Sequence, residues 1–267
     1  MDIPFFEKFL FEVWRIAKDY LIFASGTFFL FYVVLRKPLW FRKIQQKMPS
    51  FKDYRRDFLY STLTTFIGAV IILLTFKAGA DYHHVYKDIN EYGMVYYVFT
   101  FFWMFFLHDT WFYFMHRAMH HPWLFKHVHL IHHRSTNPSP WTAYAFHPLE
   151  AILEAAILPI IAFTLPVHVS AIIFFFLFQI AYNVYGHLGF EILPKGFHKS
   201  RLGKWVNTST AHNLHHHKFN GNYGLYTLFW DRLFGTVRED YDATYERVTG
   251  RSRRPVEESE FSQVAER

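Results

Sequence analysis

Histidine is the residue type whose spacing in this sequence could support chemistry. The chain has 18 histidines, and 16 of them lie between His108 and His217. Eight of these form three clusters: His116 with His120; His129 with His132 and His133; His212 with His215 and His216. Residues three or four positions apart on a helix lie on one face, one turn apart. Each cluster is therefore predicted to offer two imidazoles to the same metal ion.

The two HisHis doublets indicate more than one ion. Successive helical residues are displaced by about 100° around the axis, so one member of a doublet can serve one ion and its neighbour a second. Eight imidazoles exceed what a single ion can use if it keeps a position open for dioxygen. Imidazole suits iron, copper, zinc and nickel, and dioxygen chemistry narrows this choice to iron or copper. The clusters thus predict a site for two metal ions.

Two other functions would also use histidine-rich segments. A membrane zinc hydrolase needs about three protein ligands and a glutamate base, but the sequence contains no H-E-x-x-H motif. A membrane metal-binding or transport protein would place its ligands within the spans, near mid-bilayer. Most of the clustered histidines lie instead in polar segments between or after apolar runs. Both functions remain alternatives at this point.

Composition indicates which elements must position these histidines. Of the 267 residues, 52% are hydrophobic and 22% aromatic, more than a soluble domain of this size needs. Mean hydropathy is only +0.02, so a sizeable polar part must lie outside the bilayer. The absence of cysteine excludes disulfides, thiolate metal sites and cysteine nucleophiles. We therefore predict an all-α fold, an integral membrane helical bundle with a cytosolic helical cap that carries the histidine-rich di-metal site.

The apolar runs divide this single membrane domain, residues 1–267, into segments. The N-terminal transmembrane helices are expected within residues 20–115, at Tyr20–Leu35, Phe58–Phe76 and from Met94. Residues 149–185, interrupted at Pro166, are expected to form a transmembrane or re-entrant helical hairpin. The histidine-box catalytic region then comprises residues 116–147 and 187–236. Residues 249–267 are polar and of mixed charge, which indicates a mobile tail.

Charge asymmetry predicts the orientation of the chain. The segment Arg36–Asp57 carries eight basic residues against two acidic ones, whereas Lys77–Tyr92 has only two lysines as bases. The positive-inside rule places Arg36–Asp57 in the cytoplasm. The expected number of spans then puts every histidine cluster on the cytoplasmic side of a multi-pass protein. No cleaved signal peptide is expected, because the first residues mix acidic and basic side chains. The net charge of +6 is interpreted as basic cytoplasmic loops that contact anionic lipid headgroups. No nucleic-acid partner is expected.

Several motifs together resemble the fatty acid hydroxylase/sterol desaturase superfamily. They are the run from His108 to Glu150, the later GHLGFE, and the segment HNLHHHKFNGNYGLYTLFWDRLFGT, and they cover roughly residues 108–236. The resemblance implies the following metal ligands: His116, His120, His129, His132, His133, His187, His212, His215 and His216. Some relatives carry another histidine four residues before His187, where this sequence has Asn183. Three roles stay open for the Asn183 amide: a weak metal ligand, a contact for metal-bound water, or neither.

Three further residues are predicted to support the site from outside the ligand set. An aspartate that accepts a ligand imidazole N–H fixes its tautomer, and Asp109 is the candidate for this role. His108 precedes it directly. His147 either contacts a ligand or anchors the chain where it enters the membrane, and we favour the anchoring role.

The resemblance also implies an activity. Two Fe ions with O2 as co-substrate would hydroxylate or desaturate an unactivated C–H position of a lipid, either fatty acyl, sterol or related. The sequence shows no haem, flavin or cysteine-ligated electron module, so an external electron donor is expected, either a cytochrome or a ferredoxin with its reductase. The choice between hydroxylation and desaturation stays open, as does the oligomeric state.

Overall fold

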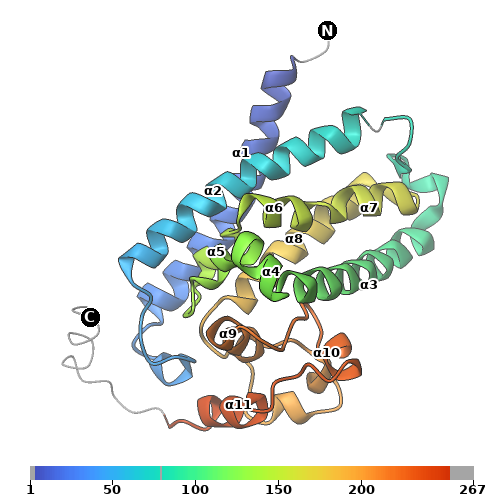
Figure 1. Cartoon of the computed structure of the whole chain (residues 1–267). Coiled ribbons are helices and arrows are strands. Elements are labelled where there is room, and N and C mark those ends of the chain that lie inside the picture. The colour runs from blue at the N-terminus through green and yellow to red at the C-terminus, as the bar shows by residue number, and fades with distance from the viewer. Residues whose placement is uncertain (1–3, 79, 253–267) are drawn as a thin grey trace.

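The computed structural model describes residues 4–78 and 80–252, and nearly all of their regular structure is helical (Figure 1). The first half contains α1 (Phe5–Phe28), η1 (Phe29–Val34), η2 (Trp40–Arg42), α2 (Phe51–Leu73), η3 (Leu74–Ala78), η4 (Ile89–Glu91) and α3 (Gly93–Met119). The middle contains α4 (Pro122–Leu124), η5 (Phe125–His129), α5 (Leu130–His133), η6 (Pro140–Tyr144), α6 (Pro148–Ala155), α7 (Ile157–Thr164) and α8 (Val169–Gly186). The last part contains η7 (Phe197–Lys199), η8 (Gly203–Trp205), α9 (Ser209–Lys218), α10 (Phe229–Leu233) and α11 (Tyr241–Thr249). The predicted helical fold class is confirmed.

Three of these helical segments are long and apolar enough to cross a membrane. They are Phe5–Val34, Phe51–Lys77 and Val169–Gly186. Their outward faces expose large apolar side chains, such as Phe11 and Ile22 on α1 and Phe174 on α8. Exposing such apolar surfaces to water is unfavourable, whereas contact with lipid tails removes that unfavourable exposure. The segments have the length and surface expected of an integral membrane protein.

The other predicted spans take a different form. Met94–Leu107 lies within α3, a 27-residue helix whose middle carries the polar pair His108 and Asp109. The run 149–165 is divided between α6 and α7, which have 8 residues each and meet at Ala156. Pro159 explains the break, because it has no N–H to donate to the Ala155 carbonyl and its ring crowds that group. Neither α3 nor the α6–α7 pair is among the three candidate spans.

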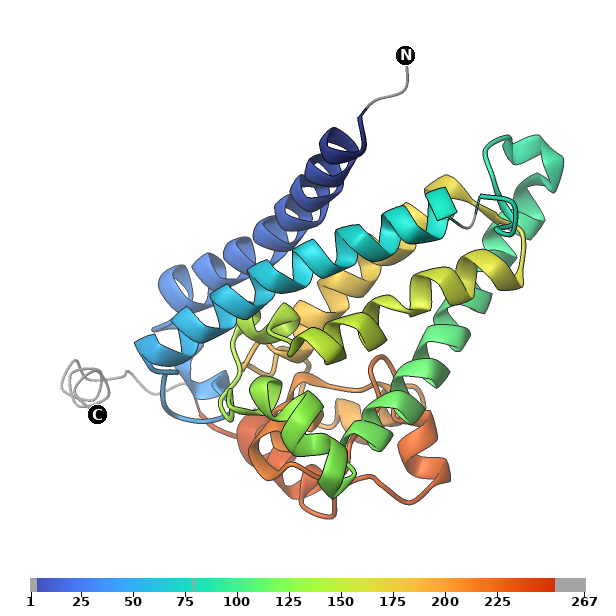
Figure 2. The ribbon, with the colours of Figure 1, turned by 45° about the horizontal axis from the view of Figure 1, so that its top comes forward.

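The long helices pack around an apolar core and close at one end with a short pair of strands. Buried residues of α3, α7 and α8 form the largest core cluster, which includes Met104, Ile161 and Phe175. The strands β1 (Val85–Tyr86) and β2 (Val167–His168) pair in parallel, with Val85 opposite Val167. They join the loop after α2 to the loop after α7, at the end of the bundle farthest from α9 (Figures 1 and 2).

The basic segment 36–57 lies at the other end, against the histidine-bearing part of the chain. The backbones of Lys43 and Phe190 pair in an isolated antiparallel β-bridge. The Gln45 side-chain amide donates a hydrogen bond to Asn213 Oδ1 at 3.0 Å. Figure 2 shows α9, α10 and α11 gathered at this end, below the long helices. The predicted tail 249–267 begins at the last residue of α11, and residues 253–267 lie outside the described part of the chain.

Candidate metal centre

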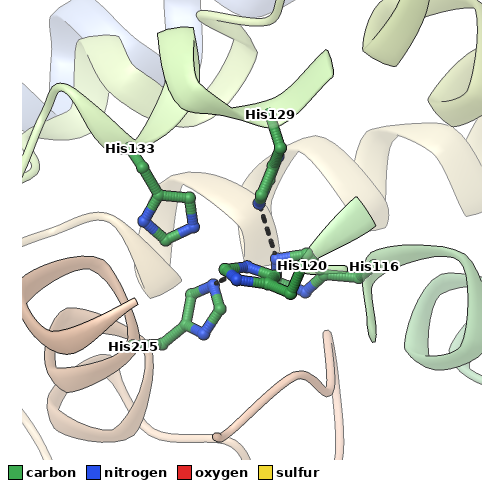
Figure 3. Close-up of side chains that lie close together, drawn as sticks. All are labelled: His116, His120, His129, His133 and His215. Atoms are coloured by element: carbon green, nitrogen blue, oxygen red, sulfur yellow. Dashed lines mark hydrogen bonds between the residues drawn. The ribbon is translucent and has the colours of Figure 1, made fainter. Parts of the chain in front are cut away.

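The structure brings all nine predicted histidine ligands together in two adjacent groups. In each group one nitrogen per residue lies within 4.8 Å of the others. The first group is His116, His120, His129, His133 and His215, and the second is His132, His187, His212 and His216. Figure 3 shows the first group, whose rings converge on a common centre from three separate stretches of chain. Each group is a candidate site for one metal ion.

Each doublet is divided between the two groups, as the helical spacing predicts. In α9, His212 and His216 are one turn apart and belong to the second group, whereas His215 belongs to the first. The segment after α4 shows the same division, with His133 in the first group and His132 in the second. One local feature differs from the expected α-helix, because residues 125–129 form a π-helical turn. Such turns occur often at functional sites.

Two imidazoles of the first group face each other in a way that calls for a cation. His116 Nε2 lies 3.0 Å from His129 Nε2. The Nδ1 atoms of both rings are occupied, because His116 Nδ1 lies 2.8 Å from the Tyr223 carbonyl and His129 Nδ1 lies 2.6 Å from Glu150 Oε1. An N–H donor at each Nδ1 leaves a lone pair on each Nε2. Two lone pairs at this distance repel unless a cation lies between them.

The second group repeats this arrangement. His187 Nε2 lies 3.1 Å from His216 Nε2. His187 Nδ1 donates to the Asn183 carbonyl at 2.7 Å, and His216 Nδ1 donates to the Ser135 carbonyl at 3.1 Å. An ion that holds nitrogens at about 2.1 Å and at right angles would separate neighbouring nitrogens by about 3.0 Å. The observed separations therefore fit two metal ions, one in each group.

Burial keeps these imidazoles in the neutral form that a metal requires. Burial, followed by the neighbouring histidines, holds the pKa of His133 and His215 well below the ordinary range. Burial also lowers the pKa of His187 to about 4. Among the described residues, neither ring nitrogen of His133 has a hydrogen-bond partner, although both are buried. Burying a polar group without a partner is unfavourable in free energy, and coordination of a metal ion would supply the missing partner.

Glu150 is the residue that sequence reasoning missed. Its side chain is fully buried, and its Oε1 accepts a hydrogen bond from His129 Nδ1–H. The second carboxylate oxygen has no hydrogen-bond partner among the described residues. A carboxylate on a ligand imidazole fixes the tautomer and raises the basicity of the other nitrogen. The available signal was an acidic residue inside an apolar run that directly follows a histidine-rich segment.

Backbone carbonyls also orient the rings of His215 and His216. His215 Nδ1 donates to the Gly221 carbonyl at 2.8 Å. Gly221 has φ of +70°, and a Cβ there would lie 2.8 Å from the Thr236 carbonyl oxygen. A side chain at this position would displace the loop that holds His215. Ser135, whose carbonyl orients His216, is itself held by its hydroxyl, which donates to the buried Asp57 carboxylate at 2.6 Å.

The structure contradicts the role predicted for Asp109. Its Oδ1 accepts the backbone N–H groups of Tyr226 and Thr227 at 2.9 and 3.1 Å, and Oδ2 accepts the Thr227 hydroxyl. No ligand imidazole contacts it, because Asp109 lies about two turns before His116 on α3 and faces the loop 225–228. Asp109 therefore fastens that loop to α3.

Replacing Asp109 with alanine is expected to destabilise the fold by roughly 2–4 kcal/mol, because it leaves two buried amides and a hydroxyl without an acceptor. Thermal or denaturant unfolding in detergent measures this change. Thr110→Ala, which removes only a hydroxyl bonded to its own helix at 2.7 Å, serves as the control and should stay within about 0.5 kcal/mol. Equal stability of the two variants would contradict the fastening role.

The other three supporting candidates lie near the groups without belonging to either. His108 Nδ1 lies 3.0 Å from the Tyr226 hydroxyl. The Asn183 side-chain amide donates to the Ala143 carbonyl at 2.8 Å, and only the Asn183 backbone carbonyl contacts a ligand ring. His147 caps α6 by accepting the Leu149 N–H, in keeping with an anchoring role.

A cavity of about 710 Å³ lies beside the second group. Its walls come from α1, α2, α6, α7 and α8 and are mostly aliphatic and aromatic. Phe146 lines it, and the Phe146 ring centroid lies 5.1 Å from that of His132. Phe146 therefore contributes both to the cavity wall and to the surroundings of His132, although none of the nine histidines lines the cavity.

A membrane helical bundle with a histidine-rich pair of candidate metal sites describes the class of this protein. The family model for fatty acid hydroxylase matches residues 101–236. This match covers half of the chain and contains all nine histidines. The chain belongs to the fatty acid hydroxylase family.

Curated relatives fall within the same group of proteins. The chain is 34% identical over 139 residues to a Delta(7)-sterol 5(6)-desaturase of Leptosphaeria maculans, which covers 52% of this chain and 37% of the relative. It is 30% identical to rat lathosterol oxidase over 159 residues, 59% of this chain and 52% of the relative. It is 34% identical to zebrafish methylsterol monooxygenase 1 over 130 residues, 49% and 44% of the two chains. The chain thus spans about a third to a half of the length of these relatives. No solved structure matches it.

Proposed function

We propose that this protein is a membrane-bound di-iron oxygenase that hydroxylates or desaturates an unactivated C–H position of a lipid. The observation that carries the proposal is the pair of histidine groups with facing Nε2 atoms at 3.0–3.3 Å. When bound, two iron ions would supply dioxygen reduction and an oxidant able to remove hydrogen from such a C–H bond. The names of the relatives, which include desaturases and a monooxygenase, support this reaction class.

The chain's own residues have distinct tasks in this proposal. The nine histidines hold the two ions, and Glu150 with the carbonyls of Tyr223, Ser135 and Gly221 keeps their rings oriented. The cavity receives the lipid. Its apolar walls exclude water from the reacting carbon, which protects the oxidant from quenching. The cavity volume of about 710 Å³ suits a sterol or an acyl chain.

The electron donor and the orientation are also proposed. Electrons are proposed to come from a separate cytochrome or ferredoxin with a reductase, as the family resemblance implies. The histidine groups are proposed to face the cytoplasm. The support is that the basic segment 36–57, which the positive-inside rule assigns to that side, contacts the histidine-bearing end through Gln45 and Lys43.

Nine nitrogen ligands argue against the alternatives weighed from sequence. A zinc hydrolase needs about three protein ligands and a base beside an open position. A transporter would place its ligands at mid-span. All nine histidines lie outside α1, α2 and α8, and His187 directly follows α8.

Lipid analysis of cells with and without the protein tests the proposed function. We expect a lipid that gains one oxygen or loses two hydrogens only when the protein is present and oxygen is supplied. The purified protein in detergent should contain about two iron ions per chain. A folded sample with less than one metal ion per chain, or lipid turnover that persists without oxygen, would contradict the proposal.

A further inference from the structure

The apolar cavity contains a small polar wall that the metal centre does not use. Tyr144, Glu154 and Gln179 all line it. The Tyr144 hydroxyl donates to Gln179 Oε1 at 3.2 Å and interacts electrostatically with Glu154. These three residues, here called the polar wall, come from η6, α6 and α8, so only the fold brings them together.

Glu154 is the unusual member of the polar wall. Its carboxyl group makes no hydrogen bond or ion pair with any other described residue. The other acidic residues of the cavity have partners, because Glu12 pairs with Arg15 at 2.7 Å and Asp19 pairs with Lys18 at 3.2 Å. A carboxyl group in an apolar cavity without a partner costs free energy. A ligand with a hydrogen-bond donor would remove this cost.

The chemistry of the polar wall selects a hydroxyl group. Glu154 can accept a hydrogen bond, and the Gln179 side chain keeps N–H donors after its oxygen has accepted from Tyr144. An alcohol can donate to the first and accept from the second.

The position of the polar wall relative to the histidines indicates which part of a bound lipid would be oxidised. The Tyr144 ring centroid lies 6.2 Å from that of Phe146, and the Phe146 centroid lies 5.1 Å from that of His132. The opposite end of the cavity is lined by Phe76, His83 and Lys87, which belong to the far end of the bundle. A ligand hydroxyl at the polar wall therefore lies at the end of the cavity nearer to the histidine groups, and the hydrocarbon body extends toward the far end of the bundle.

We propose that the cavity binds a lipid alcohol whose hydroxyl contacts Glu154 and Gln179, with the oxidised carbon only a few bonds from that hydroxyl. This inference rests on the proposed function, since it assumes that the cavity holds the substrate. The opposite binding mode, with an acidic head group at Lys87 and a long chain reaching the histidines, is the alternative that the experiment must distinguish. Lys87 is exposed and needs no buried partner, which favours the first mode.

Equilibrium binding to the purified, iron-loaded protein in detergent tests the inference. The probes are lathosterol, 1-hexadecanol, their deoxygenated counterparts cholest-7-ene and hexadecane, and palmitic acid. At least one alcohol should bind about tenfold more tightly than its hydrocarbon, the ratio expected for one hydrogen bond to a charged or buried group. Glu154→Leu should reduce that ratio to about one and leave hydrocarbon binding unchanged. Gln179→Leu should lower it in the same direction, and Lys87→Ala should not alter it.

Metal content, measured in the same samples, separates this inference from the proposed function. A wild-type protein without iron or without oxygen-dependent lipid turnover refutes the proposed function. A wild-type protein that oxidises lipid, but whose preference for alcohols survives Glu154→Leu and Gln179→Leu, refutes only the polar wall. Preferential binding of palmitic acid that is lost in Lys87→Ala also overturns the inference. Full iron content in the Glu154 variant shows that it is folded.

Discussion

Replacement of His215 by alanine is expected to abolish lipid oxidation and remove the metal ion held by the first histidine group. His215 Nε2 lies 3.2 Å from His120 Nε2, and its other nitrogen is held by the Gly221 carbonyl. Loss of even an outer hydrogen-bond partner of a metal ligand commonly costs 10–100-fold in affinity, so loss of a ligand should cost more. His132→Ala is expected to have the same effect on the second group.

The control for this experiment lies on the same helix. His217 follows the doublet directly but is exposed and belongs to neither group. His217→Ala should therefore retain the wild-type iron content and turnover. Metal content is measured by elemental analysis and turnover by product formation. Full activity in His215→Ala or His132→Ala would remove that residue from the ligand set.

The second large effect is expected at Glu150. Alanine there should lower the iron affinity about 10–100-fold and reduce turnover in parallel, because His129 loses the acceptor that fixes its tautomer. Glutamine keeps an acceptor oxygen of similar size and should restore part of the affinity. A purely structural role would instead lower the stability of both variants equally.

Glu154 provides a matched control for this prediction. It lies one turn after Glu150 on α6 but contacts no histidine of either group. Glu154→Gln should keep the wild-type iron content, measured by titration of the apo-protein with ferrous iron. If both glutamate variants lost iron alike, the effect would belong to α6 as a whole and not to the hydrogen bond with His129.

The local part of the site could be predicted from the sequence. Residues such as His212, His215 and His216 belong to one short helix, and 3.6 residues per turn determines which of them share a face. The placement of His187 came from the family resemblance and agrees with the observed second group. The long apolar runs in α1, α2 and α8 were visible for a similar reason, since length and hydropathy are properties of contiguous sequence.

The tertiary part could not be predicted. The hydrogen bond between Glu150 and His129 joins residues 21 positions apart on different elements, and no periodic pattern encodes it. Asp109 was assigned to a ligand because it precedes His116 on one helix, whereas its orientation is decided by the loop 225–228, more than 100 residues later. The interruption predicted at Pro166 is confirmed, since it separates α7 from α8, whereas the additional break between α6 and α7 near Pro159 was not predicted.

The eight residues of α6 have a consequence for protein engineering. This helix presents Glu150 to His129 and Glu154 to the cavity, so it contributes to both the proposed metal centre and the proposed lipid site. Changes to α6 that displace Glu150 should therefore also disturb the proposed iron loading, whereas changes confined to the Glu154 side chain should not. Libraries confined to the walls contributed by α1 and α8, such as Phe11, Ile173 and Phe176, should change selectivity without that penalty.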